Sequence, residues 1–130
     1  MRSIQQAVAD ALAHVGKPDI GGSGRCQEAV RTWYGLPAWA PSAADACRKT
    51  PADQKHPVKD PRDVPLGAIV YFPTMGPFGH VVLAVGDGLC VSNDYVRQGY
   101  YCKASLALPN WHGMTHDPCW SLWTPYGIAH

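Results

Sequence analysis

The chain has 130 residues, and 46% of them are hydrophobic, which is typical of a folded globular domain and excludes a disordered one. Its 13 glycines and 12 prolines exceed the roughly 12% share of average proteins, which excludes a helical bundle and predicts a loop-rich α+β or all-β fold. The net charge of +1 argues against a dedicated nucleic-acid binder. The sequence contains no run of 18 apolar residues, so it predicts no membrane-spanning helix. We therefore expect one domain over residues 1–130.

The first predicted element is a helix over residues 3–15, which Gly16 and Pro18 end. Apolar residues recur at helical spacing along it, at Ile4, Ala7, Val8, Ala11, Leu12 and Val15. Asp10 and His14 interrupt this stretch, so it does not resemble a secretory signal peptide. We expect synthesis in the cytoplasm without a Sec signal.

A second helix is predicted from Cys26 to Gly35–Pro37, after a stretch with three glycines between residues 21 and 24. Its buried face should carry Cys26, Ala29, Val30 and Trp33. A thiol in the first turn of a helix feels the positive end of the helix dipole, which favours the nucleophilic thiolate. Cys26 is therefore our candidate nucleophile, and the alternative is a buried structural cysteine.

Residues 37–66 form a proline-rich connection. One short helix is predicted inside it, from Ser42 to about Arg48, because Ser42 and Asp45 form a start similar to a capping box. We expect the rest to be loop, of a length that usually has a function.

The last part of the chain is predicted to form an antiparallel sheet, because its connections are too short for parallel crossovers. The expected strands are residues 67–73, 79–85, 89–95, 100–104 and 119–124. Gly86-Asp87-Gly88 between two apolar runs predicts a hairpin.

His80, at the start of an apolar strand, is the candidate general base. A third residue should orient it through its second ring nitrogen. A three-residue hairpin loop would put Ser92 and Asp94 on the His80 face, whereas a two-residue turn would put Asn93 there. We favour Asp94, with Asn93 as the alternative.

Five cysteines are an odd number, so at least one thiol remains outside any intramolecular disulfide. With Cys26 set aside, the other four allow three pairings, which the sequence does not rank. A zinc site is a weaker interpretation of the cysteines and histidines at Cys102, His112, His116 and Cys119, because Pro118 interrupts the segment and no C-x-x-C pair is present. We expect neither a metal nor another cofactor.

The order of these features resembles the papain-like cell-wall hydrolases of the CHAP and NlpC type. The resemblance lies in a cysteine at a helix start, then P-L-G-A-I-V-Y-F, then G-H-V-V-L-A-V-G-D-G-L-C-V-S-N-D-Y. The stretches S-N-D-Y-V-R-Q-G and W-S-L-W-T-P-Y-G-I are most similar to versions from actinobacteria and their phages. The resemblance implies a papain-like α+β fold in which the N-terminal helices pack on an antiparallel sheet.

The same resemblance implies an endolysin-like peptidase or amidase that cleaves an amide bond in peptidoglycan, with Cys26 as nucleophile, His80 as base and Asp94 as the orienting residue. The residues expected to contact the substrate are Gly24, Gln27, Trp39, Gly79 and Asn93. We expect a monomer that acts on the cell wall, with no nucleic-acid or membrane partner. The alternatives are a non-catalytic wall-binding or phage structural module and a zinc-stabilised interaction domain.

Overall fold

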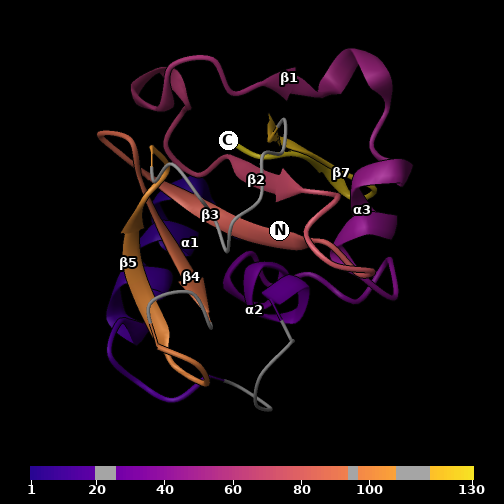
Figure 1. The fold of residues 1–130 in the computed structure, drawn as a ribbon. Coiled ribbons are helices and arrows are strands. Elements are labelled where there is room, and N and C mark those ends of the chain that lie inside the picture. Colours follow the sequence, from indigo (N-terminus) through magenta and orange to yellow (C-terminus); the bar gives the residue numbers. More distant parts are fainter. Residues whose placement is uncertain (20–25, 94–96, 108–117) are drawn as a thin grey trace.

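The computed structural model describes residues 1–19, 26–93, 97–107 and 118–130 of the chain. Over these ranges it has an α+β fold, with three α-helices and an antiparallel six-stranded sheet (Figure 1). The helices are α1 (Ile4–His14), α2 (Cys26–Trp33) and α3 (Ala43–Lys49). Within the described ranges, no helix is long and apolar enough to cross a bilayer.

The sheet has the strand order β1-β6-β2-β3-β4-β5. Its strands are β1 (His56–Pro57), β2 (Ile69–Phe72), β3 (His80–Gly86), β4 (Leu89–Asn93), β5 (Tyr101–Ser105) and β6 (Cys119–Ser121). A separate hairpin joins β7 (Trp123–Thr124) to β8 (Gly127–Ile128). The antiparallel pairing and the five predicted strand regions are confirmed. The predicted strand at 119–124 is divided between β6 and β7, and β1 lies in the connection that we expected to be loop apart from one helix.

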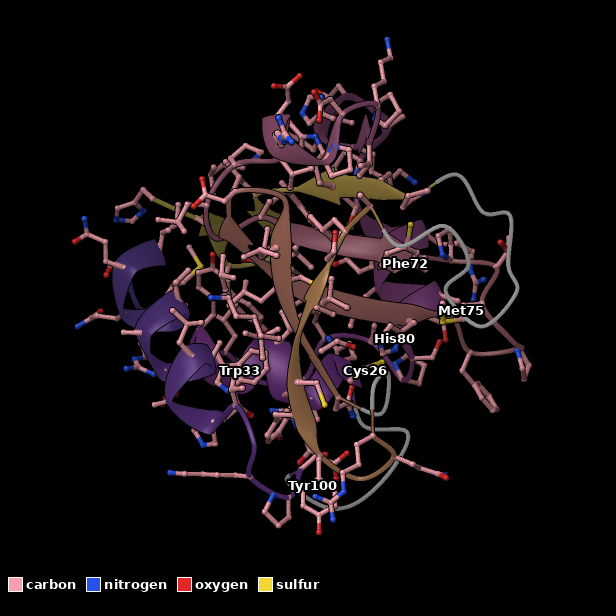
Figure 2. The ribbon with its side chains drawn as sticks, turned by 60° about the vertical axis from the view of Figure 1, so that its left-hand side comes forward. Cys26, Trp33, Phe72, Met75, His80 and Tyr100 are labelled. Atoms are coloured by element: carbon pink, nitrogen blue, oxygen red, sulfur yellow. The ribbon has the colours of Figure 1, made fainter. Side chains whose placement is uncertain are left out.

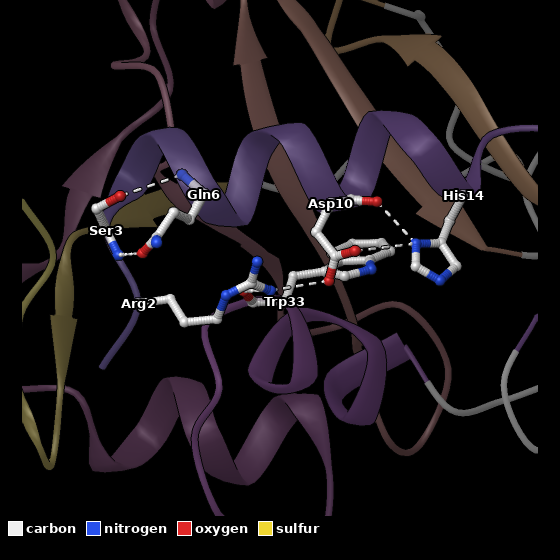
Figure 3. Close-up of polar contacts among 6 residues, drawn as sticks. All are labelled: Arg2, Ser3, Gln6, Asp10, His14 and Trp33. Carbon is white, nitrogen blue, oxygen red and sulfur yellow. Dashed lines mark hydrogen bonds and ion pairs between the residues drawn. The ribbon is translucent and has the colours of Figure 1, made fainter.

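The start of α1 is fixed by a capping box, which Figure 3 shows in detail. The Ser3 hydroxyl accepts from the Gln6 backbone N–H at 3.1 Å, and the Gln6 side chain accepts from the Ser3 backbone N–H at 2.9 Å. The predicted apolar stripe is correct for Ala7, Val8 and Ala11, which are buried. It is wrong for Leu12, which lies at the edge of the stripe and is 40% exposed, and for Val15, which follows the last residue of α1 and is 37% exposed.

The helix α2 lies on one face of the sheet and packs mainly against β3. Its four predicted face residues are all buried: Cys26, Ala29, Val30 and Trp33. They belong to a core cluster that also contains α1 residues and Val81, Leu83 and Val91 of the sheet. The Trp33 ring lies beside Tyr101, with 5.4 Å between ring centroids. The hydrophobic stripe of α2 therefore fixes Cys26 against the sheet.

A second cluster covers the opposite face of the sheet. It contains Val70 and Phe72 from β2, Val82 and Ala84 from β3, and Cys90 from β4. Because both faces are covered, the central strands are buried along their length, which explains why their sequence is an uninterrupted apolar run rather than an alternating one.

Trp33→Ala should lower the free energy of unfolding by about 3–5 kcal/mol, because the indole is only 1% exposed and its loss leaves a large cavity. Urea unfolding followed by circular dichroism would measure this. Leu12→Ala on the exposed end of α1 is the control, with an expected loss of about 0.5 kcal/mol. Equal losses in the two variants would contradict the assignment of Trp33 to the core.

Candidate active site

A pocket of about 600 Å³ opens at the start of α2. Cys26, Gln27, Glu28 and Arg31 of α2 form one side of it. The other lining residues are Ala38, Ala40, Pro41, Ser42, Ala43, Phe78 and Gly79. Cys26 begins the helix, so its thiol lies where backbone N–H groups of the first turn have no helical acceptor. The predicted position of Cys26 in the first turn is confirmed.

The far wall of the pocket is held by a close approach between α3 and the loop before β3. The Ala44 backbone N–H donates to the Phe78 carbonyl at 2.8 Å. Gly79 has a φ of +69°, and a Cβ atom there would lie 3.0 Å from the Ala44 nitrogen. Only glycine fits such a left-handed and crowded position without strain. The approach fixes the residue that directly precedes His80.

The pocket brings Cys26 close to the residue that precedes His80, and His80 itself is not among the lining residues. Cys26 and Gly79 both line it, and His80 is the first residue of β3. Figure 2 shows the Cys26 and His80 side chains where the start of α2 meets the start of β3. This juxtaposition joins residues that are 54 positions apart in the sequence.

His80 forms a hydrogen bond to Ser92 of β4, with 2.8 Å between His80 Nε2 and Ser92 Oγ. The Ser92 hydroxyl donates its one proton to the Asn93 carbonyl at 3.0 Å. Its oxygen therefore accepts from the N–H of His80 Nε2. In the neutral imidazole this puts the proton on Nε2 and the lone pair on Nδ1.

The β3–β4 hairpin combines the two loop alternatives that the sequence left open. The turn itself has two residues, Asp87 and Gly88, both with positive φ, and Gly86 pairs with Leu89. A β-bulge between Ala84 and Gly86 then shifts the register, so that Leu83 pairs with Val91. Beyond the bulge the pairing is that of a three-residue loop, which explains why Ser92 lies on the His80 face.

Asn93 lies on the opposite face of β4 from Ser92, because side chains alternate along a strand. It is 2% exposed, and its amide donates to Asp19 Oδ2 at 3.2 Å. The hydrogen bond at His80 Nε2 joins it to Ser92, and the alternative of Asn93 as the orienting residue stays a prediction. Asp94, our first choice, and Gly24 lie outside the described residues, so their roles stay predictions.

The predicted substrate contacts differ in their surroundings. Gln27 and Gly79 line the pocket, and Gln27 Nε2 is buried without a hydrogen-bond partner in the described ranges. Trp39 packs against the first core cluster, and its ring centroid lies 6.4 Å from that of Tyr126. Its sequence neighbours Ala38 and Ala40 line the pocket. The sequence analysis missed Phe78, which lines the pocket and is 71% exposed. Its position directly before Gly79-His80 was the available signal.

The sheet order contradicts a zinc site that uses both Cys102 and Cys119. These residues lie on β5 and β6, which β2, β3 and β4 separate. Four strand spacings of about 4.8 Å place them far beyond the reach of one ion, which needs each sulfur about 2.3 Å away. His112 and His116 lie outside the described residues. In the part of the chain that the structure describes, no three His, Cys, Asp or Glu side chains form a group that could hold a metal ion.

No protein-family model matches the sequence, and comparison with curated proteins finds no match. Among solved structures, the chain is similar to a wild-type endolysin, LysIME-EF1, with a TM-score of 0.59 over 81% of this chain. The fold is endolysin-like. The two sequences are 12% identical, and this chain spans 59% of the length of that endolysin. At this identity the likeness establishes the fold alone, so the activity depends on the residues of the pocket.

Proposed function

We propose that the protein hydrolyses an amide bond of bacterial peptidoglycan, with Cys26 as nucleophile and His80 as general base. The observation that carries this proposal is the pocket in which Cys26, at a helix start, meets the loop that ends at His80. The endolysin-like fold and the resemblance of the sequence to cell-wall hydrolases support peptidoglycan as the substrate. A thiol and an imidazole within reach of one substrate form the minimal pair for nucleophilic amide cleavage, and Gly79, the residue before His80, lines the pocket together with Cys26.

In the proposed mechanism, His80 Nδ1 takes the Cys26 proton, and the thiolate attacks the carbonyl carbon of the amide. The tetrahedral intermediate collapses to a thioester on Cys26, while the imidazolium gives its proton to the leaving amine. His80 then removes a proton from water, which attacks the thioester carbon; the C–S bond breaks, the acid is released, and the imidazolium returns its proton to the Cys26 sulfur. We propose that the hydrogen bond to Ser92 keeps the proton of the neutral imidazole on Nε2, which leaves the Nδ1 lone pair to accept the Cys26 proton. Asp94 remains a candidate for the same orienting role.

The walls of the pocket supply groups for binding. We propose that the Cys26 backbone N–H stabilises the oxyanion and that the buried Gln27 amide donates to the substrate. Glu28 and Arg31 lie 3.8 Å apart on the same wall, and peptidoglycan stem peptides carry both carboxylates and amines. The exposed Phe78 ring offers an apolar surface beside them. This set of groups fits a peptide better than a purely neutral glycan.

The test is incubation of the purified protein with peptidoglycan sacculi, followed by mass spectrometry of the released fragments. We expect a fall in turbidity and fragments that carry one new amine and one new carboxyl group for each cut. These new termini also identify the bond, which distinguishes an N-acetylmuramoyl-L-alanine amidase from a peptidase of the stem or the cross-bridge.

The same incubation also tests the alternative of a wall-binding module. The sacculi are sedimented, and the protein bound to them is measured. Binding to sacculi without fragments, across walls of several cross-link types, would replace hydrolysis with a purely binding role. New reducing sugar ends in place of amines would show a glycosidase and would also contradict the proposed chemistry.

A further inference from the structure

Two cysteines that the proposed mechanism does not use lie side by side. Cys47 is in α3 and Cys119 begins β6, and their sulfur atoms are 3.8 Å apart. The residues are 72 positions apart in the chain, so only the tertiary fold brings them together. A disulfide needs an S–S distance near 2.0 Å, which thiols already in van der Waals contact can reach by small side-chain rotations. This proximity selects one of the pairings that the sequence left open.

Of the four cysteines other than Cys26, the remaining two, Cys90 and Cys102, have different surroundings. Cys90 is fully buried in the second core cluster, and burial raises the pKa of its thiol to about 12. The Cys102 thiol donates to the Tyr100 carbonyl at 3.7 Å. On the β4–β5 ladder Cys90 pairs with Ala104 and Cys102 pairs with Ser92, so these two cysteines are not directly opposite one another. Their arrangement offers no comparable sulfur contact.

The surroundings of Cys47 favour a reactive thiol. The hydrogen bond with Cys119 and the nearby Lys55 ammonium lower the pKa of Cys47 to about 7, although burial opposes them. Lys55 Nζ also donates to the Cys47 carbonyl at 3.2 Å, which holds the cation beside the pair. Cys119 is partly exposed, whereas Cys47 is 5% exposed. One thiol of the pair is thus accessible from solvent and the other is readily ionised.

We propose that Cys47 and Cys119 form a reversible disulfide that fastens α3 to the sheet beside the pocket. The first turn of α3 lines the pocket through Ser42 and Ala43, and β6 pairs with β2 in the sheet. The bond would therefore cross-link a pocket wall to the rigid part of the fold. It does not depend on the activity assigned to Cys26.

The oxidant is a small-molecule disulfide or a protein of the thiol–disulfide oxidoreductase class. Cys119 gives its proton to the adjacent Cys47 thiolate as its sulfur attacks the oxidant disulfide, which forms a mixed disulfide and releases one thiolate, and Cys47 then ionises again. The Cys47 thiolate then attacks the Cys119 sulfur, which forms the Cys47–Cys119 bond and releases the second thiolate. The two released thiolates take up the two protons that the cysteines lost. The protein thus loses two hydrogens and two electrons, and the oxidant is reduced to two thiols.

The experiment uses the full chain with Cys26→Ala, so that the proposed nucleophile does not react, and oxidised glutathione as the oxidant. Trypsin separates Cys47, in residues 32–48, from Cys119, in residues 104–130, and from Cys90 and Cys102. We expect these two peptides to be joined in non-reducing mass spectrometry and separated by dithiothreitol. We also expect the melting temperature to rise by roughly 10 °C on oxidation, because the bond closes a long loop.

Cys47→Ser and Cys119→Ser should each abolish the rise, while Cys102→Ser, the matched control, should keep it. If one of these variants fails to fold, the peptide mapping of the Cys26→Ala protein still tests the proposal. Free, alkylatable Cys47 and Cys119 after oxidation, a dominant link between other cysteines, or a linked protein whose melting temperature does not rise would each overturn the proposal.

Discussion

Cys26→Ala should reduce the release of peptidoglycan fragments on the order of 10³-fold or more, because the proposed reaction loses its only nucleophile. The side chain is small and lies at the start of α2, so the substitution removes one sulfur atom and leaves the helix intact. Initial rates of turbidity loss at equal protein concentration would measure the effect. Circular dichroism and the melting temperature should remain those of the unsubstituted protein.

Cys102→Ala is the matched control, because this partly exposed thiol lies on β5 and is not among the residues that line the pocket. It should retain the full rate. If Cys26→Ala releases fragments as fast as the unsubstituted protein, the thiol mechanism is wrong, whatever the fold. If both variants lose activity equally, the loss reports a general requirement for reduced cysteines rather than a nucleophile.

The helix that carries Cys26 was predictable because its signals are local. Cys26, Ala29, Val30 and Trp33 follow helical spacing, and the structure buries all four. The same periodicity on α1 failed at Leu12, because spacing identifies which residues share a face and not how far the covering surface extends. Local sequence patterns therefore predicted the helices more reliably than they predicted which of their side chains are buried.

Predicting which residue forms the hydrogen bond to His80 required the register of the β3–β4 hairpin, which no local sequence pattern shows. A β-bulge between Ala84 and Gly86 lets a two-residue turn coexist with the strand register of a longer loop. The glycines around Asp87 predicted the turn, but no sequence signal predicted the position of the bulge that accommodates the extra residue. Ser92, although expected on the His80 face, was therefore not assigned the role that its hydrogen bond supports.

The walls of the pocket and the Cys47–Cys119 pair are products of long-range packing. Phe78 borders the pocket because the loop before β3 is bound to the start of α3. Cys47 meets Cys119 because β6 pairs with β2, although residues 73–118 separate these strands in the chain. Four cysteines allow three pairings, and sequence spacing alone does not distinguish them.

His80→Ala should lower the rate of hydrolysis by about 10²- to 10⁴-fold, since the thiol loses its base and the leaving amine loses its acid. His80→Gln is the sharper variant, because its amide can still donate to Ser92 Oγ but cannot carry a proton between Cys26 and the amine. Both variants should be similarly inactive in the turbidity assay. Activity of His80→Gln within tenfold of the unsubstituted protein would exclude His80 as the general base.

Ser92→Ala should lower kcat on soluble peptidoglycan fragments roughly tenfold and leave KM unchanged, because the variant loses one hydrogen bond that holds His80 and no group that touches substrate. Ser92→Thr keeps the hydroxyl and should restore most of kcat, which a role limited to packing would not explain. Asp94→Ala provides the decisive comparison. If it costs more than Ser92→Ala, the orienting residue is Asp94 and Ser92 only completes the contact; if it costs less, the hydroxyl at Nε2 is sufficient to hold the imidazole in the tautomer that the thiol requires.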